Sequence, residues 1–199
     1  MKNKSLDKCR ALLDAALDEF SCKSYDEASL NGILKAAGVS KSAFYYHFEN
    51  KEQLYLHLLD TAAKANWAFI SAGLPAGLQA GPDLFELFRL QAELGVQFAA
   101  AEPRYHRLYT MFLKEKDNPV CQKAQPVLEG GKEPHLEDMI AGAYDAGAFK
   151  KHYSREFVIR IVSHLFSSFH DIFPEAADTE AVLESLRSLI RFIKEGLEK

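Results

Sequence analysis

The stretch that decides the fold is residues 29–48, Ser-Leu-Asn-Gly-Ile-Leu-Lys-Ala-Ala-Gly-Val-Ser-Lys-Ser-Ala-Phe-Tyr-Tyr-His-Phe. Ser29 and Ser40 are residue types that favour helix N-caps, and Gly38 readily adopts the left-handed conformation that ends a helix. Apolar residues recur at helical spacing between the first cap and the glycine, at Leu30, Ile33, Leu34 and Ala37. The spacing predicts two short helices joined by a tight turn at Gly38-Val39.

We predict that the second of these helices runs from about residue 41 to 46. Val39, Phe44 and Phe48 fall where side chains pack back on the first helix. The remaining side chains point elsewhere and are small, polar or aromatic: Lys41, Ser42, Ala43, Tyr45, Tyr46 and His47. Such a surface suits a helix that enters a DNA major groove. The alternative is a helical hairpin inside a bundle, with its aromatic side chains buried.

The composition is that of a globular protein of one or two domains. The chain has 199 residues, of which 48% are hydrophobic and 26% charged. No run of 18 apolar residues is present, so we expect no membrane contact. The first eight residues carry charges throughout and lack the apolar centre of a signal peptide, which indicates a cytoplasmic protein.

The net charge of −4 argues against a nonspecific polyanion binder but not against a specific one. The charged residues within 29–51 are three lysines, Lys35, Lys41 and Lys51, and one carboxylate, Glu49. This is a modest positive excess. Phosphate contacts depend on this local charge, and because it is modest we expect dimerisation to matter for DNA affinity. The three cysteines show no C-x-x-C spacing, and we interpret them as buried or partly buried thiols without a redox or metal role: Cys9, Cys22 and Cys121.

The rest of the chain is helical in pattern, and the fold class we predict is all-α with nine or ten helices. Capping signals and apolar spacing predict helices at about 5–22, 51–72, 83–101, 103–114, 154–173 and 178–197, and a broken helical segment from 118 to 146. Asn50 followed by Gln53 caps the helix that starts at Lys51. This helix of some 20 residues spans about 30 Å, enough to link a DNA-binding domain, residues 1–50, to a second domain, residues 51–199.

Residues 29–54 resemble the DNA-binding signature of the tetracycline-repressor (TetR) family. The resemblance rests on Ser29, the Ala-Ala-Gly-Val-Ser turn, the segment Lys41 to Phe48 and the following Lys-Glu-Gln-Leu, and it is specific over about residues 5–60. It implies a dimeric transcription factor, usually a repressor, with an N-terminal three-helix DNA-binding domain. A larger C-terminal domain would bind an inducer.

The resemblance also implies roles for single residues. Ser29 is similar to the hydroxyl residue that caps the second helix and meets a phosphate. Other positions match those that commonly contact phosphates: Ser40, Tyr45, Tyr46, His47 and Lys51. Lys41, Ser42 and Ala43 fall where the recognition helix meets base edges. Many members have Gly and Thr at the positions of Ser42 and Ala43, so we expect few direct base contacts here and a larger share of the specificity from DNA shape.

The second half of the chain has apolar surface for dimerisation and aromatic side chains for a cavity. The helices at about 154–173 and 178–197 carry more apolar positions than one internal face needs, which predicts a homodimer through a four-helix interface. The alternative is that this surface is all internal core. We expect a largely apolar pocket for a hydrophobic or aromatic effector, lined by Trp67, Phe88, His106, Tyr109, Phe112, Met139, Tyr144, Phe166 and His170.

No pattern of a metal site, a cofactor site or an active site is present. His164 and His170 are six residues apart, on different faces of a helix, and no phosphate loop, G-x-S-x-G or H-E-x-x-H motif occurs. We therefore predict a ligand-responsive repressor, not an enzyme, that needs no metal or cofactor and binds a palindromic operator in double-stranded DNA. The alternatives are a helical small-molecule or lipid-binding protein without DNA binding and, last, an all-helical enzyme.

Overall fold

The computed structural model describes residues 2–75, 84–115, 117–129, 136–173 and 179–198. The chain divides into two compact units. Unit 1 comprises residues 1–67 and 99–132, and unit 2 comprises residues 68–98 and 133–199. The chain crosses from one unit to the other within helix α4 and again within helix α5, so each of these helices belongs to both units.

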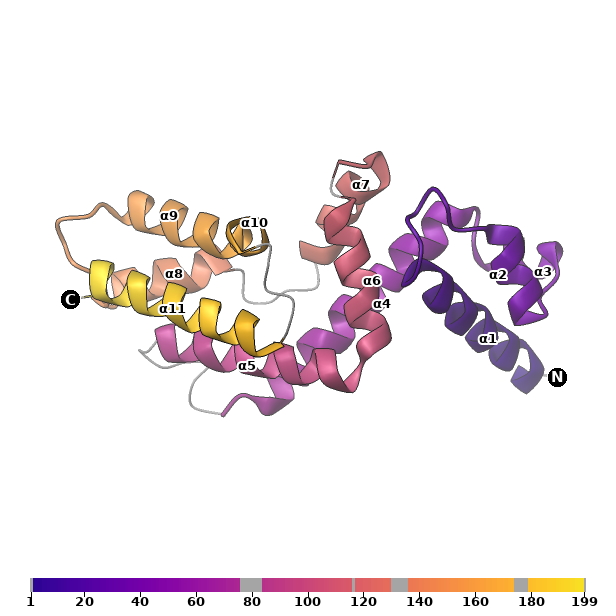
Figure 1. Cartoon of the computed structure of the whole chain (residues 1–199), viewed down its shortest axis with the longest axis horizontal. Helices are drawn as coiled ribbons and strands as arrows, with labels where there is room; N and C mark the ends of the chain where they lie inside the picture. The colour runs from indigo at the N-terminus through magenta and orange to yellow at the C-terminus, as the bar shows by residue number, and fades with distance from the viewer. Residues whose placement is uncertain (1, 76–83, 116, 130–135, 174–178, 199) are drawn as a thin grey trace. The chain divides into compact units, whose positions relative to one another are not determined.

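The elements follow one another along the chain as helices separated by short connections (Figure 1). Their bounds are α1 Lys2–Phe20, α2 Leu30–Ala37, α3 Lys41–His47, α4 Lys51–Gly73, α5 Leu84–Ala101, α6 Pro103–Lys114, α7 Pro119–Glu129, α8 Leu136–Asp145, α9 Arg155–Ser167, α10 Phe169–Ile172 and α11 Thr179–Leu197.

The predicted all-α class is confirmed. Counting the four-residue α10 as the end of α9, the described residues hold ten helices, and they contain no β-strand beyond an isolated bridge between Phe149 and Glu198. The range 154–173, expected as one helix, is divided at Ser168, which is the C-cap of α9 and the N-cap of α10. The cap expected at Asp83 for α5 lies outside the described residues.

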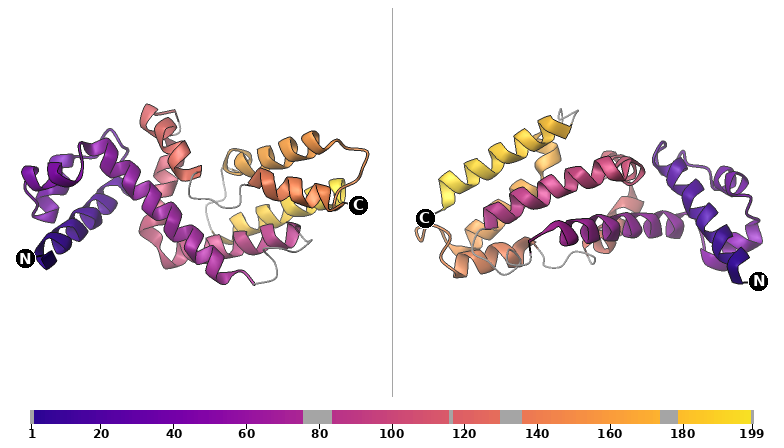
Figure 2. Two further views of the ribbon diagram at one scale, coloured as in Figure 1. Left: turned by 180° about the vertical axis from the view of Figure 1, so that it is seen from behind. Right: turned by 90° about the horizontal axis from the view of Figure 1, so that it is seen from below.

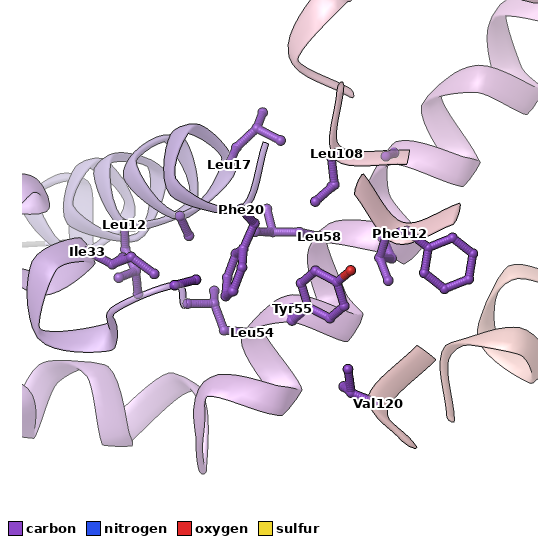
Figure 3. Close-up of a cluster of buried hydrophobic side chains, with 14 of the residues drawn as sticks. Leu12, Leu17, Phe20, Ile33, Leu54, Tyr55, Leu58, Leu108, Phe112 and Val120 are labelled. Atoms are coloured by element: carbon purple, nitrogen blue, oxygen red, sulfur yellow. The ribbon is translucent and has the colours of Figure 1, made fainter. Parts of the chain in front are cut away.

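The core of unit 1 joins helices that are far apart in the sequence. α1 contributes Leu12, Leu17 and Phe20, and α4 contributes Leu54, Tyr55 and Leu58, to one buried cluster (Figure 3). Leu108 and Phe112 of α6 and Val120 of α7 are buried in this same cluster (Figure 3). α6 and α7 are therefore part of the hydrophobic core that supports α2 and α3.

Polar contacts also tie α6 and α7 to the N-terminal helices. Arg104 at the start of α6 donates to the carboxylates of Asp14 and Asp18 on α1, at 3.1 Å each. Lys123 of α7 donates to both carboxylate oxygens of Glu52 at the start of α4, at 2.9 Å. Because all of these side chains are at least partly exposed, each pair adds little stability, and the shared apolar core contributes most of the attachment.

Unit 2 is built from α5, α8, α9, α10 and α11 around a second buried cluster. α8 and α9 lie side by side (Figures 1 and 2). Phe88 of α5 lies against Phe166 of α9, with ring centroids 4.5 Å apart, and Ile140 of α8 is fully buried. Tyr144 of α8 donates its hydroxyl to the carbonyl of Tyr153 at 2.7 Å, which fixes the connection between α8 and α9.

No helix among the described residues is long and apolar enough to span a membrane. The predicted boundary after residue 50, between a DNA-binding domain and a ligand-binding and dimerisation domain, stays a prediction. The compact units divide the chain elsewhere, because α6 and α7 pack on the N-terminal helices.

Candidate nucleic-acid interface

Residues 29–48 form two helices whose ends are closed by the residues that the sequence indicated. The Ser29 hydroxyl accepts a hydrogen bond from the N–H of Gly32 at 3.1 Å and caps α2. Gly38 has φ +63° and ends α2 in the left-handed conformation, with its N–H directed at the carbonyls of Leu34 and Lys35. A β-carbon would strain the backbone at Gly38, and for this reason glycine suits the turn.

The start of α3 is fixed by two serines. The Ser40 hydroxyl accepts a hydrogen bond from the N–H of Ala43 at 3.3 Å and also lies 3.1 Å from the hydroxyl of Ser42. Phe44 is fully buried and Val39 is buried, so α3 is anchored on the core through these side chains. The anchoring leaves the opposite side of α3 open.

The open side of α3 carries polar and aromatic side chains. Lys41, Ser42 and His47 are exposed, and Tyr45 and Tyr46 expose 58% and 83% of their surface. The His47 ring stands edge-on to the Tyr46 ring at 5.0 Å. Aromatic side chains are more often buried than exposed. Two exposed tyrosines beside a lysine and a histidine therefore indicate a binding surface for a polar or charged partner.

The remaining candidates for DNA contact lie beside α3. Ser29 and Ser40 are exposed at the starts of α2 and α3, whereas Ala43 is partly buried against the core. Lys51 at the start of α4 is partly buried, and its ammonium donates to the carbonyls of Tyr25 and Ala28 at 2.7 and 3.0 Å. An ammonium has three N–H donors, so these two bonds leave one donor for an anion.

Glu19 of α1 supports the N-terminus of α2, a role that the sequence did not reveal. Its carboxylate accepts hydrogen bonds from the N–H of Ser29 at 2.9 Å and from the Lys23 ammonium at 2.8 Å. The bond from Lys23 and, next, the bond from Ser29 lower the pKa of Glu19. Glu19 and Ser29 are ten residues apart in different elements, so no local pattern links them.

The nine residues expected to bind an effector are divided between the two units. Unit 1 contains Trp67, His106, Tyr109 and Phe112, and unit 2 contains Phe88, Met139, Tyr144 and Phe166. The side chain of His170 lies outside the described ones. Phe88 and Phe112 are buried, and Tyr109 stacks on Phe112 with centroids 6.1 Å apart. The lining of an effector pocket stays a prediction.

One described groove lies elsewhere, between α9 and α11 of unit 2, with a volume of about 210 Å³. It is lined almost entirely by apolar side chains: Tyr153, Phe157, Ile161, Leu165, Phe192, Ile193, Gly196 and Leu197. None of the nine expected effector residues lines it. Among the described residues no group of three or more histidine, cysteine or carboxylate side chains is placed to hold a metal ion.

Comparison with known proteins agrees with the geometry of residues 29–48. Residues 12–58 match the model of the family described as bacterial regulatory proteins, tetR family. The probable acrEF/envCD operon repressor of Escherichia coli (strain K12) is 25% identical over 169 residues, which cover 83% of this chain and 76% of the repressor. The IcaR negative transcriptional regulator of the biofilm operon icaADBC in Staphylococcus epidermidis is 41% identical over 44 residues, 22% of this chain and 24% of IcaR.

Solved structures share the fold over nearly the whole chain. A TetR family transcriptional regulator from Chloroflexus aurantiacus J-10-FL has a TM-score of 0.69 and 22% identity, covering 96% of this chain and 94% of that one. The structure of a TetR-family regulator from Syntrophomonas wolfei str. Goettingen gives a TM-score of 0.69 at 21% identity, covering 95% of each chain. Residues 12–58 therefore match the tetR family of bacterial regulatory proteins, and the chain is similar to an operon repressor over most of its length.

Proposed function

We propose that the protein is a ligand-responsive repressor that binds a palindromic operator as a homodimer and is released by a small, largely hydrophobic or aromatic effector. The observation that supports DNA binding is the exposed side of α3. This side presents Lys41, Ser42, Tyr45, Tyr46 and His47, while the Ser40 cap and the buried Phe44 hold the helix in place. Such a regulator would act in the cytoplasm, where its operator is.

The exposed side chains of α3 suit both kinds of DNA contact. The Lys41 ammonium and the Ser42 hydroxyl reach base edges, while Tyr45, Tyr46 and His47 donate to phosphate oxygens on either side of the groove. The Ser42 hydroxyl is hydrogen-bonded to the Ser40 hydroxyl at 3.1 Å. This bond restricts the directions in which the Ser42 hydroxyl can bond a base. With Ala43 partly buried, direct readout involves few groups, and the width and deformability of the operator supply further specificity.

The groove between α9 and α11 supports dimerisation. Phe192 exposes 70% of its surface and Phe157 exposes 48%, and both line this groove. Contiguous exposed apolar side chains of this size mark protein interfaces. A second copy would place its own α9 and α11 against these two helices, burying the phenylalanines in a four-helix contact around a two-fold axis. The two-fold axis then demands a palindromic operator, with half-sites about one DNA turn apart.

The effector part of the proposal rests on α4 and on the aromatic candidates. α4 begins beside α3 and ends in unit 2, so a change at its C-terminal end alters the orientation of its N-terminal end. The effector can release the operator only through a difference in affinity between the DNA-binding and the released states. Expected contacts are the nine aromatic and polar candidates named above.

The test is binding of the purified protein to duplexes from its own upstream DNA, followed by fluorescence anisotropy at several salt concentrations. We expect sequence-selective binding, loss of that binding on Tyr45→Ala, and a salt dependence that reflects phosphate contacts. Lys64→Ala is the matched control, because Lys64 of α4 is exposed and paired with Asp60 away from α3. Absence of selective binding, combined with small molecules retained by the protein in native mass spectrometry, would favour a ligand-binding protein without DNA binding.

A further inference from the structure

Tyr25, in the connection between α1 and α2, has both polar groups of its backbone bonded by side chains from other elements. Its N–H donates to the Glu115 carboxylate at 2.8 Å, and its carbonyl accepts from the Lys51 ammonium at 2.7 Å. The ammonium also lies 4.3 Å from the centroid of the Tyr25 ring. A single residue therefore joins the end of α6 to the candidate phosphate ligand at the start of α4.

The turn between α6 and α7 holds Glu115 in place. Glu115 ends α6, and its carbonyl accepts from the N–H of Asn118 at 2.8 Å. The Asn118 side chain donates to the carboxylate of Asp26 at 3.1 Å. Two adjacent residues, Tyr25 and Asp26, are thus bonded by Glu115 and Asn118 of the same connection.

The position of the Lys51 ammonium depends on the backbone of residues 25–28. Its two acceptors are the carbonyls of Tyr25 and Ala28, and the Tyr25 ring adds a cation–π contact. A lysine side chain has four rotatable bonds and is poorly ordered unless acceptors hold it. The N–H and the carbonyl of Tyr25 belong to the two peptide units that meet at its Cα. If Glu115 no longer holds the N–H, the backbone at Tyr25 can rotate, the carbonyl turns and the ammonium loses its shorter bond.

We propose that Glu115 is a positioning residue for the DNA contact of Lys51, acting through the backbone of Tyr25. This inference rests on the proposed function, because it needs Lys51 to bind a phosphate. It gives the regulatory half of the chain a second route to the DNA: a shift of α6 reaches Lys51 through Glu115 and Tyr25, without a change in the orientation of α4.

The experiment measures the affinity of the full-length protein for its upstream duplex against salt concentration. The logarithm of the DNA association constant falls linearly with the logarithm of the salt concentration, and Lys51→Ala should make this slope less steep by about 0.9 per protomer. Glu115→Ala should lower it by a similar amount and weaken binding up to about eightfold per protomer at 0.1 M salt. Glu115→Gln keeps an oxygen that accepts from Tyr25 and should recover most of the affinity.

Arg104→Gln is the matched control. Arg104 also links α6 to the N-terminal helices, through Asp14 and Asp18, but does not touch Tyr25. It should leave the salt slope unchanged. If Glu115→Ala does not fold, as judged by circular dichroism, Glu115→Asp replaces it, because the shorter side chain keeps the charge and withdraws the acceptor.

The double variant separates a positioning role from general destabilisation. If Glu115 acts through Lys51, Glu115→Ala should cause no further loss of affinity in a protein that already carries Lys51→Ala. An equal loss in both backgrounds would overturn the inference. If Lys51→Ala lowers the slope and Glu115→Ala does not, the inference alone is wrong. If the wild type binds no operator, or Lys51→Ala leaves the slope unchanged, the proposed DNA contact is wrong and the inference fails with it.

Discussion

Replacing Leu108 with alanine tests whether α6 is part of the core that holds the DNA-binding helices. Leu108 lies in α6, in the half of the chain that the sequence assigned to effector binding and dimerisation. In the structure it is fully buried in the same cluster as Leu12, Phe20 and Leu58 (Figure 3). The substitution should therefore lower the stability of the packing among α1 to α4 and not that of unit 2.

The expected size follows from complete burial. Removing the isobutyl group of a fully buried leucine and leaving a cavity costs about 2–5 kcal/mol. Because every 1.4 kcal/mol is a factor of ten in an equilibrium constant, amides that exchange by opening of unit 1 should exchange at least about 30-fold faster. Ile140→Ala, at a fully buried position in unit 2, is the matched control.

The assay is native-state hydrogen exchange, with peptides resolved by mass spectrometry. Leu108→Ala should raise exchange in peptides from residues 12–37 and 51–62, and Ile140→Ala should raise it in peptides from residues 84–98 and 155–166. Faster exchange in residues 84–98 and 155–166 alone, after Leu108→Ala, would refute the assignment of α6 to the core of unit 1.

Three further outcomes follow. Gly38→Ala should destabilise unit 1 by about 1–2 kcal/mol in urea unfolding, because φ is +63° there; unchanged stability would contradict the strain argument. The pKa of Glu19 is below its ordinary 4.5, so its bonds to Lys23 and Ser29 stabilise the fold at pH above 4.5 and are lost as pH falls through the folded pKa. Glu19→Gln should accordingly lower stability at pH 7 and converge with the wild type in acid; a constant difference between pH 7 and 3 would exclude this origin. Phe192→Glu should convert the proposed dimer to a monomer in analytical ultracentrifugation, whereas dimers of undiminished affinity would place the interface elsewhere.

Local signals predicted the elements around α3 well. Ser29, Gly38 and Ser40 act within three or four residues of their own position, and caps and turns of this kind depend on backbone geometry more than on distant packing. The starts of α4 at Lys51 and of α6 at Pro103 were predicted for the same reason. The break at Ser168 was missed, because no glycine or proline marks it.

The sequence alone determined an all-α chain with a capped helix-turn-helix whose second helix exposes Lys41, Ser42 and two tyrosines, because these features follow from local spacing. Only the tertiary structure decided where α6 and α7 pack, since the contact of Glu115 with Tyr25 joins residues 90 positions apart. It likewise showed that Lys51 is held by the carbonyls of Tyr25 and Ala28. Contacts at such separation depend on which apolar faces meet in the core, and no periodicity within one helix specifies its partner.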